Sequence, residues 1–416
     1  MDFQVNQRLN LHGLSLLSLL LVPALLLSTR NISVIVIVFM FLVSIYYLVK
    51  NRPSCDMNRY DYLVILSLSA YFLSYIPITI ADGSTLRYFQ GGIRLLFCIP
   101  IYFVFKSIFI DQLDQAKERL SIGVIIGSFG ALIVAMYQFF ILQMPRVDGF
   151  LFSINFGYLA CSLAFLALCL CFKSKYKTLL ILAFFAAAIS TLLTLTRGAI
   201  VAIPMLLVFC AALNWKQLSF KLTSALIVGL LGLSLTAYWF SDPIRDRIDY
   251  TVYEVSHIIS GDVAAATSSG TRLFLWKAAT EAFKQSPLIG LPYEQRETLN
   301  QQLYEQGWVN EYTRDLTRGH AHSQYFEMLA SSGVLGIIAM IMMLVMPLII
   351  FVQHYCSTQS IWGYTGAVFV TGFMIFGLTE APLQANLIST FYGFMLATFF
   401  ALIRIEKYNA QLSLNQ

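Results

Sequence analysis

Long apolar runs separated by short polar turns dominate the chain. A membrane-spanning helix needs about 20 mainly apolar residues, and twelve stretches fit that pattern. They cover 11–28, 31–49, 61–80, 93–112, 121–143, 154–172, 178–195, 199–215, 222–240, 333–353, 363–379 and 387–404. The eighth is short, and tight turns at Thr29–Arg30 and Thr196–Arg197–Gly198 leave re-entrant segments as an alternative. The pattern predicts an all-α, polytopic integral membrane protein with about twelve transmembrane helices.

One long polar segment interrupts these runs. It divides the chain into 1–240 with nine spans, a loop at 241–332, and 333–416 with three spans and a short tail. Within the loop, the stretch from Ser269 to Pro287 predicts a helix that Ser269 or Thr271 caps and Pro287 ends. The loop is the place where we expect the chemistry.

Composition and charge support this class. Of 416 residues, 58% are hydrophobic and 12% are charged, and the net charge is only +5. A soluble protein could not cover so much apolar surface, and nucleic-acid binding needs a clustered basic face. With the N-terminus in the cytoplasm, fourteen basic residues fall on the cytoplasmic side, five in short outward loops and eight in 241–332. This bias predicts cytoplasmic termini and an outward-facing loop.

Basic residues on the outward side are arginines, except for Lys277 and Lys284. Arginine presents a rigid donor fork that suits phosphate, whereas lysine is a point charge. Arg272 lies in the first turn of the predicted loop helix and shares a face with Trp276. Arg197 lies at the outer membrane boundary. Both arginines are candidate phosphate ligands; the alternatives are an ion-paired Arg272 and an Arg197 that only anchors its turn.

Two histidines, His320 and His322, precede the tenth span. A zinc site needs three or four ligands, and no spacing of other residues completes a set, so we expect no metal. If a helix began near His320, the two side chains would diverge and have different roles. A general base is one interpretation, because histidine titrates near neutral pH. The other is a pair of interfacial polar residues.

Together these motifs resemble the O-antigen ligase superfamily, which includes O-antigen polymerases and protein O-oligosaccharyltransferases. The resemblance rests on three motifs that occur in the same order and on the same side of a twelve-span layout. They are Thr194-x-Thr-Arg197-Gly; Arg272-x-x-x-Trp276-x-x-Ala279 followed by Ser286-Pro-Leu-Ile-Gly290; and His320-x-His322-Ser-Gln before an apolar helix with Gly333 and Gly336. Ser323 stands where family members more often have asparagine.

The resemblance implies a GT-C-like glycosyltransferase of the bacterial inner membrane in lipopolysaccharide biosynthesis. Its donor would be O-antigen on undecaprenyl pyrophosphate, its acceptor a sugar hydroxyl of lipid A–core, and its loop and active site periplasmic. Arg197 and Arg272 match the family's pyrophosphate-binding arginines, and His322 matches its essential histidine. Arg146 resembles a further donor-site arginine, whereas Arg94, Arg318 and His320 are substrate-binding candidates on electrostatic grounds only. No cofactor or nucleic acid is expected. No metal is expected either, since the outward loops contain no D-x-D motif.

Three alternatives remain open. A polymerase tends to divide its outer polar mass between two loops, whereas this chain has one, which favours a ligase. A protein O-oligosaccharyltransferase usually extends further at its C-terminal end. A transporter or flippase predicts charges inside the spans, and the spans at 121–143, 154–172, 199–215, 222–240 and 333–353 contain none.

Overall fold

The computed structural model describes residues 2–51, 57–172, 174–214 and 242–414, with scattered positions between 224 and 239. Every regular element among these residues is a helix, as the apolar pattern predicts. In the first half of the chain they are α1 (Asp2–Ala24), α2 (Ile32–Asn51), α3 (Arg59–Ser74), α4 (Ile76–Asp82), η1 (Arg87–Phe89), α5 (Gln90–Leu96), α6 (Cys98–Ile108), α7 (Leu113–Met136), η2 (Tyr137–Ile141), α8 (Ser153–Leu170), α9 (Lys177–Leu193) and α10 (Arg197–Leu213). In the second half they are α12 (Asp242–Ile259), α13 (Ser269–Gln285), α14 (Tyr293–Glu305), α15 (Glu311–Arg314), α16 (Gln324–Met340), η3 (Ile341–Val345), α17 (Met346–Thr358), α18 (Ile361–Phe376), η4 (Pro382–Gln384) and α19 (Asn386–Leu414).

Seven helical stretches of the described chain are long and apolar enough to cross a membrane. They are Ile32–Asn51, Arg59–Asp82, Arg87–Ile108, Leu113–Ile141, Ser153–Leu170, Gln324–Thr358 and Asn386–Ser413. Four shorter apolar helices accompany them: Asn10–Ala24, Lys177–Leu193, Arg197–Leu213 and Ile361–Phe376. The chain is therefore a multi-pass helical membrane protein. Each of these eleven coincides with a predicted span, whereas the predicted span 222–240 falls largely outside the described residues, so the count of twelve stays a prediction.

Close backbone packing holds the bundle together. A Cβ at Gly123 would lie 2.3 Å from the carbonyl oxygen of Leu20, and one at Gly127 would lie 2.1 Å from that of Pro23. Both glycines lie on α7 and face α1, so they let the two backbones touch, as small residues four apart commonly do in membranes. The most enclosed long helix is α19, with 94% of its apolar window buried. It packs against α5, α6 and α18 and forms the core of the bundle.

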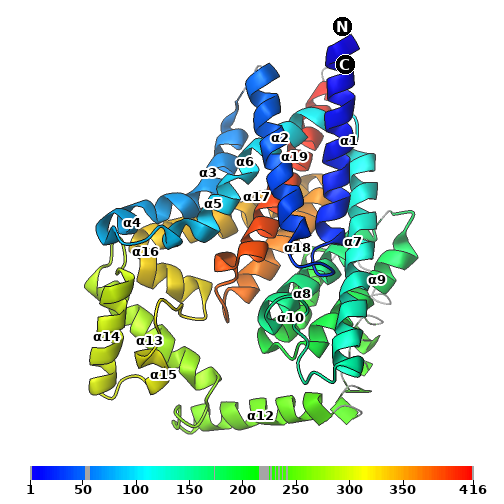
Figure 1. Ribbon diagram of the computed structural model, residues 1–416. Coiled ribbons are helices and arrows are strands. Elements are labelled where there is room, and N and C mark those ends of the chain that lie inside the picture. The colour runs from blue at the N-terminus through cyan, green and yellow to red at the C-terminus, as the bar shows by residue number, and fades with distance from the viewer. Residues whose placement is uncertain are drawn as a thin grey trace.

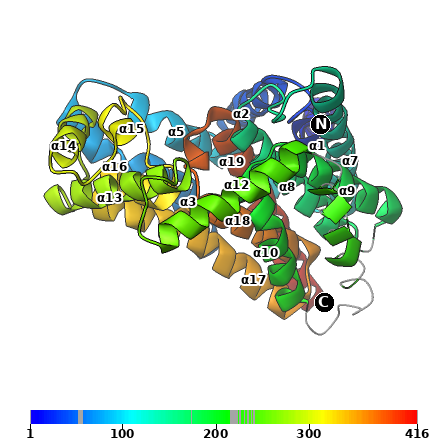
Figure 2. The ribbon, with the colours of Figure 1, turned by 90° about the horizontal axis from the view of Figure 1, so that it is seen from below.

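Both termini lie at one end of the bundle, and α12 to α15 lie at the opposite end, called here the site end (Figure 1). There α12 runs crosswise to α1 and α7, and the view from that end shows it crossing the face of the bundle (Figure 2). Helices α13, α14 and α15 cluster beside α16.

A kink in α16 joins this cluster to the bundle. Gly333 has φ 58° inside the helix, and a Cβ there would lie 2.4 Å from the carbonyl oxygen of Pro287. The backbone N–H of Val334 donates to that same oxygen at 2.8 Å. The turn after α13 is thereby docked on α16, and the predicted boundary between 332 and 333 falls at this kink, nine residues inside the helical stretch that begins at Gln324.

Candidate active site

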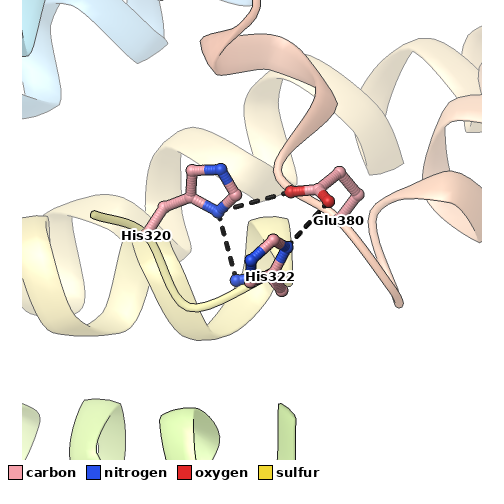
Figure 3. A group of neighbouring side chains, drawn as sticks. All are labelled: His320, His322 and Glu380. Carbon is pink, nitrogen blue, oxygen red and sulfur yellow. Dashed lines mark hydrogen bonds and ion pairs between the residues drawn. The ribbon is translucent and has the colours of Figure 1, made fainter. Parts of the chain in front are cut away.

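The two histidines lie in a loop, and both face one carboxylate. Helix α16 begins only at Gln324, after Ser323 in an extended conformation, so helical spacing does not apply to His320 and His322. His322 has φ 45°, which turns its ring back toward that of His320, with ring centroids 4.6 Å apart. The expected divergence of the two side chains is therefore wrong. Both rings converge on Glu380, from the turn after α18 (Figure 3).

Contacts within this trio are short. His322 Nδ1 lies 2.8 Å from Oε2 of Glu380, and His320 Nδ1 lies 3.3 Å from Oε1. Glu380 is 6% exposed. Burial raises the pKa of its carboxyl group, but the hydrogen bond from His322 and the charges of the two histidines outweigh burial, so the net shift is downward. Burial lowers the pKa of His320, which leaves that ring mainly neutral near pH 7.

An ionised Glu380 fixes the proton on His322. A carboxylate only accepts hydrogen bonds, so His322 donates from Nδ1 and its Nε2 carries a free lone pair. The same arrangement orients the histidine base of serine hydrolases. His322 lines a cavity of about 990 Å³ at the site end. It can therefore take a proton from a hydroxyl group bound there.

Hydrogen bonds to backbone carbonyl oxygens connect the histidine loop to the turn that carries Glu380. The N–H of Gln324 donates to the carbonyl oxygens of Gly377 and Glu380, both at 2.8 Å. The hydroxyl of Ser323 donates to the carbonyl oxygen of Gly377 at 3.1 Å. Ser323 thus has a definite role in holding the histidine loop against α18.

Four arginines line a second cavity of about 370 Å³. They come from separate elements: the loop before α8, the first turn of α10, α12 and α13. They are Arg146, Arg197, Arg247 and Arg272. Trp276 from the next turn of α13 lines the same cavity and stacks on Phe326, with ring centroids 5.0 Å apart.

A buried carboxylate, Glu254 of α12, organises this cavity. It accepts from Arg197 at 2.5 Å and from the backbone N–H groups of Ser268 and Ser269 at 2.6 and 3.2 Å. Burial raises the pKa of Glu254, but Arg197 and these N–H groups outweigh burial and lower the pKa to about 2. Glu254 also replaces the predicted cap of α13: the N-cap residue is Ser268, whose side chain makes no capping bond. The prediction that Ser269 or Thr271 caps the helix is wrong, because a carboxylate from a neighbouring helix satisfies those N–H groups.

Among the described residues, the four arginines of the second cavity have one carboxylate partner, Glu254. Burial and the neighbouring arginines Arg197 and Arg272 lower the pKa of Arg146, and burial likewise lowers that of Arg247. Buried donors on Arg197 (Nη2), Arg247 (Nε) and Trp276 (Nε1) have no acceptor among the described residues. Buried donors are usually paired, so this cluster is suited to a multivalent anion such as a phosphate group.

The two cavities adjoin. Arg146 and Ile154 line both of them. Arg272 donates from Nε to the carbonyl oxygen of Thr379 at 3.3 Å, and the next residue is Glu380, the partner of His322. The dipeptide Thr379–Glu380 therefore connects the arginine cluster to the histidine base.

The remaining predicted site residues are placed as follows. His320 and Arg318 line the larger cavity, and the backbone N–H of Arg318 donates to Glu297 at 2.8 Å. Arg94 lies on α5, where its guanidinium bonds the carbonyl oxygen of Gln90, and it lines neither cavity. The structure therefore groups Arg146, Arg197 and Arg272 together and leaves Arg94 apart.

Sequence reasoning missed Glu380, Glu254 and Arg247. Glu380 has a signal, because it is an acidic residue in a short turn between two apolar spans. Glu254 and Arg247 have none, since each is one of several charges in the polar start of the loop.

Glu380 also supplies the third metal ligand that sequence spacing did not identify. The ligand atoms of His320, His322 and Glu380 lie within 4.8 Å of one another. However, both Nδ1 atoms are already engaged, one with Glu380 and one as acceptor from the backbone N–H of His322 at 3.2 Å. A cation bound at these atoms must displace those hydrogen bonds.

Comparisons with known proteins point to one family. A family model described as O-antigen ligase matches residues 182–341, which include Arg197, Arg272, His322 and their connecting helices. The chain is also similar to an uncharacterised protein of Haemophilus influenzae. The two are 23% identical over 363 residues, covering 84% of this chain and 88% of the relative.

Proposed function

We propose that this member of the O-antigen ligase superfamily is the ligase itself, with its site end in the periplasm. It transfers O-antigen polysaccharide from undecaprenyl pyrophosphate to a sugar hydroxyl of lipid A–core in the bacterial inner membrane. Family members transfer glycans, so a transferase role is the broader statement that the comparison supports. The observation that carries the proposal is the Thr379–Glu380 connection between an unbalanced arginine cluster and a histidine base.

The arginine cluster has the chemistry for the pyrophosphate. As the glycosidic bond breaks, its electron pair moves to the pyrophosphate oxygen, and negative charge develops there. Arg146, Arg197 and Arg272 stabilise that charge without reorganising, because their positions are fixed by backbone and carboxylate contacts. The unpaired donors on Arg197 and Trp276 supply further hydrogen bonds.

The histidine base acts on the acceptor. The acceptor oxygen attacks the anomeric carbon from the larger cavity, and its proton passes to Nε2 of His322. Glu380 holds the ring and stabilises the imidazolium that forms, as a positioning residue. Proton transfer of this kind typically contributes about 10²–10⁴-fold to a rate. Direct displacement inverts the anomeric configuration, and no metal takes part.

Gene deletion separates the ligase from its relatives. Lipopolysaccharide from the deletion strain should lack every long O-antigen ladder on gels, with lipid-linked polymer accumulating. A core that carries a single repeat would instead identify a polymerase. Unchanged lipopolysaccharide with altered glycosylation of proteins would identify a protein O-oligosaccharyltransferase.

A further inference from the structure

Helix α12 differs from an ordinary surface helix, because it buries charged residues and exposes apolar ones. Its buried face carries charge: Glu254 is fully buried, and Arg247 lines the arginine cavity. Its exposed face includes an apolar stripe at helical spacing i, i+4, i+7 and i+11. The stripe consists of Ile248, Val252, Val255 and Ile259, which are 43%, 64%, 47% and 81% exposed.

A third face is polar and exposed. Asp246, Asp249 and Ser256 lie on it. At 100° per residue, the three faces are separated by roughly a third of a turn each. A helix with one face on protein, one apolar and one polar fits a position at the boundary between bilayer and water.

The surroundings of α12 agree with this position. It lies crosswise to the spanning helices at the site end (Figure 1). Its Glu254 is bonded to Arg197, the first residue of α10. One turn further along α10, Val201 is 55% exposed, and Val208 is 70% exposed. Helix α12 is therefore anchored at the start of α10, a shorter apolar helix of the bundle that exposes apolar side chains of its own.

We propose that the lipid bilayer covers the apolar stripe of α12, which lies in the interface of the leaflet at the site end and borders the entrance to the arginine cavity. The stripe sits in the headgroup–acyl boundary, and the protein-facing side of the helix holds Arg247 and Glu254 in place. Building on the proposed function, a lipid-linked pyrophosphate then reaches the arginines from within the leaflet, beneath α12. Its headgroup need not leave the membrane interface to bind.

Fluorescence quenching in nanodiscs tests the position of the helix. Val252→Cys and Val255→Cys are labelled with an environment-sensitive dye, and Asp246→Cys on the polar face is the matched control. The background carries Cys55→Ser and Cys356→Ser; the other five cysteines are buried. Lipids brominated near the acyl carbonyl should quench the labels at 252 and 255 at least about threefold more than the label at 246, since an interfacial helix lies about 5–10 Å into the headgroup–acyl boundary.

Equal quenching at all three positions would overturn the proposal. A second result would also overturn it: labels at 252 and 255 that become shielded from water only as protein concentration rises. In that case a second copy of the chain would cover the stripe. This readout needs no enzymatic activity, so it stands apart from the proposed function.

A transfer assay tests the consequence. Val252→Asp with Val255→Asp should lower transfer about tenfold for a long-chain donor embedded in the bilayer, because charges oppose burial of the stripe. The same variant should act normally on a short-chain, water-soluble donor analogue. Equal losses with both donors would contradict an entrance from the leaflet, whereas no turnover by the unaltered protein would contradict the proposed function instead.

Discussion

Glu327 holds the backbone of Ala321, the residue between the two histidines. Its Oε2 atom accepts the Ala321 N–H at 2.9 Å, while Arg296 of α14 binds both carboxylate oxygens at 2.9 and 3.0 Å. Glu327 is 1% exposed, and Ser331 donates to its Oε1 at 2.9 Å. The pair thus fixes the histidine loop between α14 and α16, although neither side chain needs to touch a substrate.

Breaking this pair should affect stability and rate differently. Arg296→Met leaves a buried unpaired carboxylate and should destabilise the protein by about 3–5 kcal/mol. Adding Glu327→Leu should restore much of the thermal stability, because an apolar pair replaces the buried ions. Transfer should stay about 10- to 100-fold low in the double variant, since Ala321 has lost its acceptor and the histidines lose their position. Recovery of full activity along with stability would show that the pair is only structural.

Glu380→Gln should lower the turnover rate on the order of 10²–10⁴-fold, with donor affinity nearly unchanged. The amide no longer fixes the proton on Nδ1 of His322, although the side chain keeps its size. Glu406→Gln is the matched control, because Glu406 pairs with His354 at the same 2.8 Å among α17 and α19. The measurements are turnover and donor binding for each variant. Equal losses of turnover in Glu380→Gln and Glu406→Gln would show that Glu380 does not position His322.

The arginines and the histidine should divide between binding and transfer. His322→Ala should abolish transfer and leave donor binding nearly intact, whereas Arg272→Ala should weaken both. Lysine at 272 should rescue only partly, because the charge returns without the bidentate fork. Arg197→Ala is a harsher change, since it also leaves Glu254 without its ion pair. Donor affinity is measured beside transfer rate, and unchanged donor binding in both arginine variants would place the pyrophosphate elsewhere.

Acid should loosen α12. The pKa of Glu254 is depressed from 4.5 to about 2, so its contribution to stability is complete above the unfolded value and declines as pH falls toward 2. Limited proteolysis of the segment 260–267 should therefore accelerate between about pH 5 and pH 2.5. Glu254→Gln should be cut faster already at neutral pH and should vary little over that range. A wild-type profile in this variant would mean that other groups control the helix.

Chelation should leave transfer intact. The trio of His320, His322 and Glu380 could offer three ligands, but its Nδ1 atoms are committed to internal hydrogen bonds. Purified protein in excess EDTA should still convert donor and acceptor to product. The contrary result would be transfer that strictly requires added magnesium, manganese or zinc. If Glu380→Gln then lost both binding of that ion and the metal-dependent transfer, a metal centre would be established.

Apolar runs were enough to predict the helical class and the positions of eleven apolar helices, seven of them long enough to span a membrane, because lipid demands long apolar helices with satisfied backbones. Arg197 and Arg272 could also be singled out, since unusual positions for cations stand out against an apolar chain, whereas Arg146 was suggested by the family resemblance alone. Glu254 and Glu380 could not be assigned to the site, because they reach Arg197 and His322 through tertiary contacts across 57 and 58 residues of sequence. Arg247 joins the other arginines only through the shared cavity. The relation between His320 and His322 was mispredicted for a local reason: the positive φ at His322 lies outside what helical spacing describes.

The shared wall of the two cavities bears on the order of events. Arg146 and Ile154 line both spaces, and Thr379–Glu380 connects them. In the proposed transfer, the leaving group and the incoming hydroxyl therefore have separate chambers that adjoin at these residues. For the proposed transfer, neither substrate has to vacate its chamber before the other enters, and the two products can depart by different routes. The proposed transfer therefore follows a sequential scheme, in which donor and acceptor are bound together in a ternary complex. The lipid pyrophosphate left after transfer occupies the smaller chamber, so it competes with new donor. It does not affect binding of the acceptor.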